Sequence, residues 1–378
     1  MIGRLGILAT ALLIATQSVR AVSADVIGYT TIPNGTSFGK TLVGGLSGIS
    51  YDAETRTFWA ISDDSINKGG PPRAYQLAIQ FDSNGIHSLK ILKVLPLRNA
   101  KGQPIDIADC EGISATGHGG IWVASEGRGG VPPFVQLFDL TDGSAIRDLP
   151  LPSVFLPKDA TGKFIRPGSP AQISGFLPNK SLESCAISPD LQTVYIANET
   201  SLLQEKALGE GKGGASLFNR TQVRISALDA QTGVLLGQKL YQSDAGCMFG
   251  SISDLVSLDD HGKLLVLERR VTSLSEGPGA CNIRIYNIDF GQDSATDLRD
   301  IPNVNANSNV VPLKKNLVFD SSEAGIDNLD NVEGICVAPL PDGSTALVGI
   351  SDNNFDKAQQ TQIWLFRYSK SADNKSTP

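Results

Sequence analysis

The sequence predicts an all-β protein that folds into a single β-propeller, with six blades expected and seven as the alternative. A segment built of an apolar strand, a turn and a second apolar strand recurs five times along the chain. The 39 Gly and 20 Pro among 378 residues suit many tight turns, and a hydrophobic content of 41% allows a large core. We expect more blades than copies, because the gaps between the copies are uneven and leave room for further strands.

The first residues have the pattern of a secretory signal peptide, which we place at residues 1–24. Met1–Arg4 forms a short basic region, Leu5–Ala15 is apolar, and Val22–Ala24 is a small-residue cleavage site. The apolar run is too short to cross a bilayer, which takes about 20 apolar residues. We therefore expect an exported protein, periplasmic or secreted, with a mature chain that begins at Asp25 and has no membrane span.

The mature chain reads as one domain over residues 25–369, followed by a polar tail at 370–378 that we expect to be disordered. The net charge of −7 and the pI of about 5.1 argue against nucleic acid as a partner, because phosphates require a basic surface. We expect a monomer that acts on a small molecule.

The repeated segment supplies the strands of the predicted blades. The five copies are LSGISYDAETRTFWAISDDS from Leu46, CEGISATGHGGIWVASEGR from Cys110, LESCAISPDLQTVYIANETS from Leu182, ISDLVSLDDHGKLLVLERR from Ile252 and VEGICVAPLPDGSTALVGISDNN from Val332. The second half of each copy is a short run of β-branched, aromatic or other apolar residues, as in Phe58–Ile61 and Ile121–Ala124. Such runs are typical of strands.

Each copy places one residue at the start of its first strand and an acid at the end of its second strand. The start residues are Ser47, Glu111, Glu183, Ser253 and Glu333. The end residues are Asp63, Glu126, Glu199, Glu268 and Asp352. Equivalent positions of successive propeller blades form a ring around the central channel, so we expect these acids to converge at one channel mouth.

Several carboxylates at close range raise one another's pKa unless a cation compensates them. Two kinds of compensator are visible: the basic residues Arg128, Arg269 and Arg270, or a hard divalent ion such as Ca²⁺, which takes about six to eight oxygen ligands. The alternative is that each acid caps its own turn, a frequent use of Asp and Glu after a strand. At the fourth copy, Asp254 follows Ser253 and is a candidate substitute for the missing acid.

Other catalytic or metal signatures are absent from the sequence. It has no CxxC, HExxH or GxSxG pattern, so zinc and serine-hydrolase chemistry lack support. Three of the five cysteines, Cys110, Cys185 and Cys336, lie in the repeated strands, where we expect buried thiols. Cys247 and Cys281 flank the fourth copy in loop-like sequence, and a disulfide between them is left open.

Several of these motifs resemble the phytase-like family, described as having esterase-like activity of phytase. The resemblance lies in GLSGISYD, DCEGIS, SLESCAISPD, LLVLERR with NIRIYNID, and above all NVEGICVAP with GISDNNF. It implies an exported bacterial β-propeller that hydrolyses phosphate esters or related esters. Glu111, Glu183, Glu333, Asp352 and Asn353 match the family's motif residues by position.

We expect metal-assisted hydrolysis, with one Ca²⁺ or similar cation held by Glu111, Glu183, Glu333 and Asp352. Asp63, Glu268 and Asn353 are further candidate ligands. Glu126 or Glu199 is the candidate base, and Arg128, Arg269 or Arg270 would bind the phosphate.

Two other functions remain open. One is a propeller that binds a ligand or protein without catalysis. Long loops at Leu151–Pro178 and Lys206–Gly214 suit a binding site or a plain insertion. The other is a lactonase-like or phosphotriesterase-like propeller, with one Ca²⁺ held by Glu111 or Glu333 together with Asn198, Asn353 and Asp63.

Overall fold

The computed structural model describes residues 23–206, 220–273, 275 and 277–369. Nearly all of the expected signal peptide, the expected tail and most of the loop at Lys206–Gly214 lie outside these residues. Among the residues described, no helix has the length and apolar character needed to cross a membrane. The described part of the chain includes two single-turn 3-10 helices, η1 (Leu203–Glu205) and η2 (Val304–Ala306).

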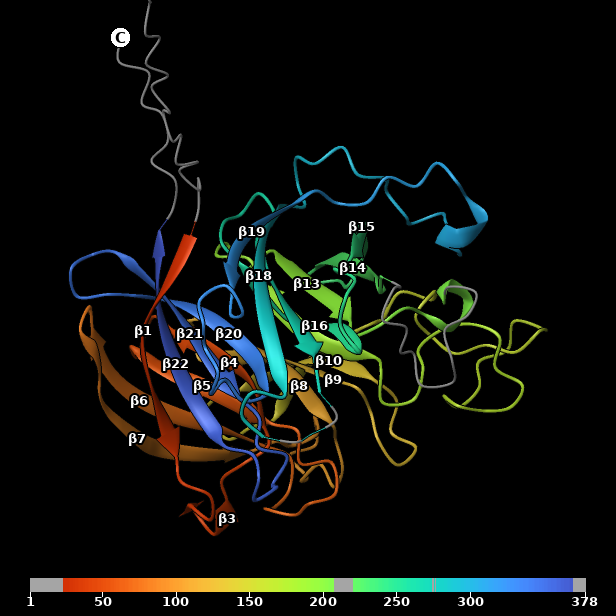
Figure 1. Ribbon diagram of the computed structural model, residues 1–378. Coiled ribbons are helices and arrows are strands. Elements are labelled where there is room, and N and C mark those ends of the chain that lie inside the picture. Colours follow the sequence, from red (N-terminus) through yellow and green to blue (C-terminus); the bar gives the residue numbers. More distant parts are fainter. Residues whose placement is uncertain (1–22, 207–219, 274, 276, 370–378) are drawn as a thin grey trace, which may run out of the picture.

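The described chain forms five four-stranded antiparallel sheets, which are the blades of a propeller (Figure 1). Blade 1 contains β4 (Leu46–Asp52), β5 (Thr57–Ser62), β6 (Arg73–Asp82) and β7 (Gly85–Pro96). Blade 2 contains β8 (Cys110–Ala115), β9 (Gly120–Ser125), β10 (Phe134–Asp139) and β11 (Ala145–Leu149). Blade 3 contains β12 (Leu182–Ile187), β13 (Thr193–Asn198), β14 (Gln222–Asp229) and β15 (Leu235–Gln242).

The last two blades complete the propeller. Blade 4 contains β16 (Phe249–Ser257), β17 (Lys263–Val271), β18 (Cys281–Asp289) and β19 (Lys315–Asp320). Blade 5 contains β20 (Val332–Pro339), β21 (Thr345–Ser351), β22 (Thr361–Ser369) and the N-terminal strand β1 (Ser23–Ile32). A small hairpin of β2 (Ser37–Phe38) and β3 (Thr41–Leu42) follows β1.

The first strands of the blades, β4, β8, β12, β16 and β20, form a closed ring. Each contacts the first strand of the next blade, and β20 returns to contact β4. The strands approach so closely that a Cβ at Gly112 would lie 2.6 Å from the backbone nitrogen of Cys185 in blade 3. A Cβ at Gly334 would lie 2.8 Å from the carbonyl oxygen of Ser47 in blade 1. The repeated glycine after the start residue therefore permits a narrow ring.

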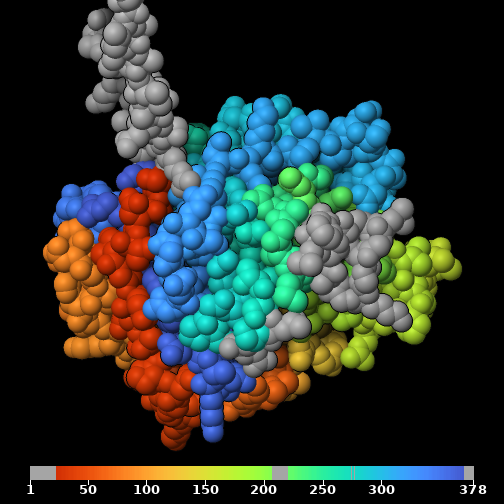
Figure 2. All heavy atoms as spheres, in the orientation of Figure 1, coloured from red at the N-terminus to blue at the C-terminus, as the bar shows by residue number. Residues whose placement is uncertain are grey.

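The N-terminus closes the propeller by supplying the outermost strand of the last blade. β1 pairs antiparallel with β22, from Ala24 opposite Tyr368 to Ile32 opposite Thr361. The Tyr29 ring stacks on Trp364 at a centroid distance of 4.5 Å. Figure 2 shows this red segment packed alongside blue C-terminal segments. The two ends of the domain are thus held in one sheet.

Five large hydrophobic clusters lie between neighbouring blades, one at each boundary. In β5, Ala60 packs toward blade 5 while its neighbours Trp59 and Ile61 pack toward blade 2. This follows from the alternation of side chains along a strand, which sends successive residues to opposite faces of the sheet. Both faces of each blade are therefore buried, which explains the nearly continuous apolar runs.

The prediction of an all-β propeller is confirmed, but the expectation of six or seven blades is wrong. The structure has five blades, and each copy of the repeated motif supplies the two innermost strands of one blade. The uneven gaps between copies hold the outer strands and long loops, such as residues 150–181 between β11 and β12. Loop length, not additional blades, accounts for the uneven spacing.

All five cysteines are buried free thiols. The expectation for Cys110, Cys185 and Cys336 is confirmed. Cys247 and Cys281 do not form the disulfide that the sequence left open, and the Cys281 thiol lies 3.7 Å from the amide oxygen of Asn331.

Candidate functional site

Every innermost strand carries a β-bulge at its start. The ladder with the second strand shifts register between Leu46 and Gly48, and at the equivalent place in the other four blades. The bulged residues are Ser47, Glu111, Glu183, Ser253 and Glu333. A bulge re-aims the side chain of its extra residue, so the start residues of the motif share one local geometry.

The end residues follow the second strand at the same end of each blade. Leu46 pairs with Ser62 in blade 1, and Asp63 comes next. Ile252 pairs with Glu268 in blade 4, so the equivalent residue there is Arg269. The five structurally equivalent residues are Asp63, Glu126, Glu199, Arg269 and Asp352. The end position therefore carries four acids and one arginine.

The alignment expected for Glu268 needs correction by one residue. Successive side chains of a strand point to opposite faces, so Glu268 points away from the face that Arg269 occupies. Its carboxylate accepts hydrogen bonds from the Tyr241 hydroxyl at 2.6 Å and from Lys315 Nζ at 2.5 Å. Glu268 belongs to a buried polar network of blade 4 and does not join the other end residues.

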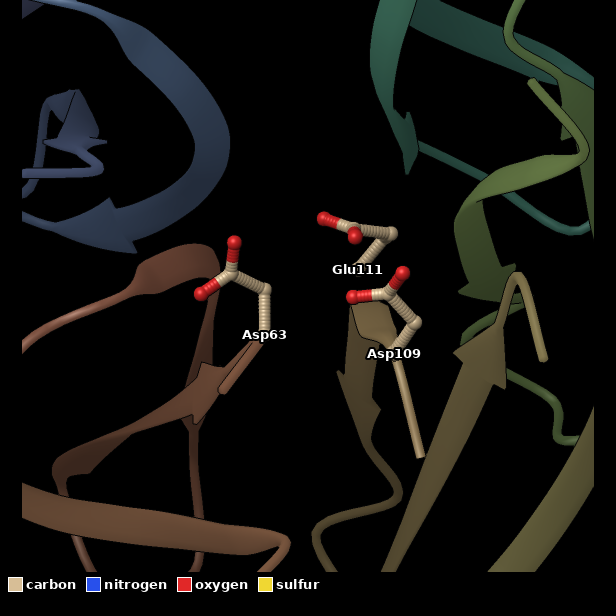
Figure 3. Close-up of side chains that lie close together, drawn as sticks. All are labelled: Asp63, Asp109 and Glu111. Atoms are coloured by element: carbon tan, nitrogen blue, oxygen red, sulfur yellow. The ribbon is translucent and has the colours of Figure 1, made fainter. Parts of the chain in front are cut away.

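Three carboxylates from blades 1 and 2 gather at the channel mouth. Asp63, Asp109 and Glu111 place carboxylate oxygens within 4.8 Å of one another, and Figure 3 shows their side chains close together. Asp109 forms an ion pair with Arg128 at 3.1 Å. Within the described chain, Asp63 and Glu111 have no side-chain hydrogen bond. These residues line a pocket of about 290 Å³. We call this trio the first acid cluster.

A second trio lies between blades 2 and 3, where Glu126, Glu183 and Glu199 also bring oxygens within 4.8 Å. Glu199 is compensated by Lys180 at 2.8 Å and by Arg269 at 3.3 Å. Glu126 accepts a hydrogen bond from the backbone nitrogen of Ser181. The second acid cluster therefore holds more compensating groups than the first.

Blades 4 and 5 complete the ring with a cation of their own. The Arg269 guanidinium forms an ion pair with Glu333 and donates a hydrogen bond to the amide oxygen of Asn331 at 2.9 Å. The Asn331 amide nitrogen donates to Glu333 at 3.0 Å. Asp352 accepts a hydrogen bond from the backbone nitrogen of Asn354 at 2.8 Å. Glu333 is thus held by protein groups.

Burial and mutual repulsion shift the titration of these acids. The pKa values of Asp63, Glu111, Glu183 and Asp352 all lie well above the ordinary range, first because burial disfavours the charged form and then because neighbouring carboxylates repel it. The same two causes raise the pKa of Glu126 to about 8. Burial would lower the pKa of Arg269, but Glu333, Glu199 and Glu183 raise it. The site carries more negative charge than its cations neutralise.

The remaining candidate residues serve the fold. The Asn353 amide oxygen accepts from the Gly45 nitrogen at 3.0 Å, and the Asn198 oxygen accepts from the Arg224 nitrogen at 2.9 Å. Asp254 bridges blades 4 and 5 by accepting from the nitrogens of Leu255 and Ile335, both at 2.8 Å. The structure therefore does not bring Asn198, Asn353 and Asp254 together with the acid clusters as free ligands.

Sequence reasoning missed Asp109 and Lys180. Asp109 precedes Glu111 by two residues, as Asn331 precedes Glu333, and both contact a cation of the ring, Arg128 and Arg269 respectively. The shared pattern of a polar residue two places before EG, in DCEG and NVEG, is a signal that could have identified Asp109. Lys180 lies in a loop and has no such signal.

Comparisons with known proteins point to one family. The model of the Phytase-like family, described as "Esterase-like activity of phytase", matches residues 41–355. A comparison with curated proteins gives no match. Among solved structures, a thermostable family-43 glycoside hydrolase aligns with a TM-score of 0.48 and 11% identity, covering 91% of this chain and 97% of the other. A DUF4221 protein from Bacteroides vulgatus aligns with a TM-score of 0.41 and 8% identity, covering 93% and 99%.

Proposed function

This chain belongs to the phytase-like family, and we propose that it is a metal-assisted hydrolase of phosphate esters or related esters. The observation that carries the proposal is the first acid cluster, in which Asp63, Asp109 and Glu111 converge within 4.8 Å. Export through the expected signal peptide is part of the proposal, as is Ca²⁺ as the cation.

The donor set of the first acid cluster fits a hard divalent ion. Three carboxylates offer the oxygen ligands that Ca²⁺ prefers, and only Asp109 has a cationic partner. Of the two further acids that the sequence suggested as ligands, Glu333 is neutralised by Arg269, and Asp352 accepts a hydrogen bond from the Asn354 nitrogen. We therefore assign the cation to Asp63, Asp109 and Glu111, with Glu183 next to them in the ring. A bound divalent ion would polarise an ester oxygen and lower the pKa of a bound water.

Arg128 is the arginine best placed to bind the substrate. Its side chain is 42% exposed, and it lines the pocket above the first acid cluster. One of its nitrogens, Nη1, contacts Asp109 and Asn179. A guanidinium has five N–H donors, so others remain for a phosphate or carbonyl oxygen. Arg269 is held by Glu333, Glu199 and Asn331, and Arg270 donates to the carbonyl of Ala245 at 2.9 Å.

Glu126 is our candidate for proton transfer. It is buried at the end of β9 and held in place by the backbone of Ser181. A carboxyl with a pKa of about 8 is mostly protonated at neutral pH, which suits a group that donates a proton to the leaving alcohol. Glu199, the other candidate, is neutralised by Lys180 and Arg269.

The proposal is tested by Asp63→Asn, with Asp148→Asn as the matched control on the exposed strand β11. We expect Asp63→Asn to weaken Ca²⁺ binding, measured by calorimetry, by at least about tenfold. We also expect it to abolish the EDTA-sensitive hydrolysis of p-nitrophenyl phosphate and p-nitrophenyl butyrate. Ca²⁺ binding without turnover of any ester would support a binding propeller instead, and equal Ca²⁺ affinity in both variants would refute the site.

A further inference from the structure

A pocket of about 690 Å³ lies beside the acid clusters, between the loop that follows β9 and the long loop between β11 and β12. Its volume is in the range of sites for small organic ligands, roughly 300–1,000 Å³. Buried Glu126 and the partly exposed Arg128 are among the residues that line it. The second of these loops contains the Leu151–Pro178 segment, drawn in yellow and yellow-green in Figure 1.

The walls of this pocket are mostly apolar and are set by the fold. The apolar lining residues include Val131, Pro132, Pro133, Ile165, Phe176 and Leu177. Phe176 is fully buried and stacks on Phe155 at a centroid distance of 4.9 Å, which anchors the long loop. Gly127 has a φ of +73°, and a Cβ there would lie 2.5 Å from the Val131 carbonyl oxygen, so the first loop folds tightly back on itself. The pocket is therefore preformed.

The apolar pocket adjoins the pocket over the first acid cluster. Arg128 and Asn179 line both, and their side chains contact each other at 2.5 Å. Arg128 also contacts Asp109 at 3.1 Å. An ester whose reacting group lies over the first acid cluster can thus extend its organic group past Arg128 into the apolar pocket.

We propose that this pocket binds an apolar organic group of the substrate, so that the enzyme prefers monoesters of aryl or bulky alkyl alcohols. The inference rests on the proposed function, since it assigns the ester group to the first acid cluster. The apolar pocket also disfavours inositol polyphosphates as substrates, because their several phosphates require several unpaired cations. Around the two pockets, within the described chain, the cations are Lys68, Arg128 and Arg166, while Lys180 and Arg269 are paired with carboxylates.

The test uses Val131→Asp, because Val131 is 39% exposed and its replacement leaves the core intact. The matched control is Val234→Asp, in an exposed turn of blade 3 at 59% exposure. Substrates are 1-naphthyl phosphate, methyl phosphate and inositol hexakisphosphate. We expect kcat/KM of the unaltered enzyme to favour 1-naphthyl phosphate over methyl phosphate by about tenfold or more, and Val131→Asp to lower this ratio by about tenfold while Val234→Asp leaves it unchanged.

Binding of 1-naphthol in EDTA, followed by fluorescence, separates the pocket from the chemistry. We expect Val131→Asp to weaken this binding by about tenfold, while Val234→Asp leaves it unchanged. If no ester is hydrolysed but 1-naphthol binding still depends on Val131, the proposed function fails and the apolar pocket stands. A preference for inositol hexakisphosphate, or equal effects of the two variants, would overturn the proposal.

Discussion

Arg269 on β17 donates a hydrogen bond from Nη1 to Oε1 of Glu333 on β20, across the boundary between blades 4 and 5. The same guanidinium lies 3.3 Å from Glu199 of blade 3. This contact divides the ring of acids into two parts. Glu199 and Glu333 of blades 3 and 5 are neutralised by this protein cation, whereas other ring carboxylates, among them Asp63 and Glu111 of blades 1 and 2, have no ion pair within the described chain. The second part is where an added cation would relieve the most repulsion.

Replacing Arg269 by Met should strongly destabilise the protein at neutral pH. The substitution leaves Glu333 and Glu199, 9% and 1% exposed, without that partner. Removing one member of a buried ion pair costs about 3–5 kcal/mol in free energy of unfolding. Urea denaturation at pH 7.5 measures this loss. The double variant Arg269→Met/Glu333→Met should recover a large part of it, and equal losses in the single and double variants would contradict the assigned pairing.

The stability of the cation-free protein should fall as pH rises. The pKa values of Asp63, Glu111, Glu183 and Asp352 are raised in the folded state. The stability that such carboxyls contribute is fully present below their unfolded pKa of about 4 and is lost as pH rises through their folded values. Because the pKa of Glu126 is raised to about 8, the loss should extend to about that pH.

Melting temperatures in EDTA between pH 4 and about pH 8 check this expectation. Saturating CaCl₂ should flatten the decline, because a bound cation favours the ionised carboxylates. The double variant Asp63→Asn/Glu111→Gln removes two titrating groups and serves as the reference, so its decline in EDTA should be shallower. A profile as steep in this variant as in the unaltered protein would show that other groups control the pH dependence.

The repeated motif identified the inner strands of all five blades because their apolar runs and start residues are features of the local sequence. The alternation and the bulge recur wherever the sequence repeats, so Glu111, Glu183 and Glu333 fall at equivalent places. The predicted number of blades was wrong because the sequence between two copies does not show, without knowledge of the strand pairing, whether it forms loops or the strands of a further blade. Each copy of the motif supplies the two inner strands of one blade.

The site itself was only partly predictable. In the fourth copy, Glu268 and Arg269 are adjacent, and a shift of one residue decides which of them lies at the end position. The acids at the end positions of the other copies favour Glu268, but the pairing of Ile252 with Glu268 places Arg269 at the end position. Asp109 and Lys180 enter the site through contacts with residues distant in the sequence, which no local pattern records. Ion pairing between blades is a property of the closed ring.

Gly112→Ala should destabilise the propeller by about 1–3 kcal/mol, the usual cost of overpacking. A Cβ at this position would lie 2.6 Å from the backbone nitrogen of Cys185 and 2.7 Å from the Cα of Ser184, so blades 2 and 3 would have to separate. The control is Gly28→Ala in β1, where nothing lies within 4 Å of the added Cβ. Chemical denaturation of both variants decides the matter, and similar losses would show that the ring is not tightly packed at Gly112.

Closure of the propeller by β1 predicts a sharp limit to N-terminal truncation. A chain starting at Asp25, the expected mature N-terminus, keeps the pairing of Asp25 with Arg367 and the stacking of Tyr29 on Trp364. A chain starting at Pro33 lacks the whole strand and leaves β22 as an unpaired edge, which favours aggregation.

We expect the chain starting at Asp25 to be folded and cooperative in thermal unfolding, and the chain starting at Pro33 to aggregate or melt at a much lower temperature. Size-exclusion chromatography and circular dichroism distinguish these outcomes. Adding a synthetic peptide of residues 25–32 to the shorter chain should partly restore its melting temperature, since the peptide can pair with the free edge. A stable, monomeric chain without residues 25–32 would show that β1 is dispensable for the fold.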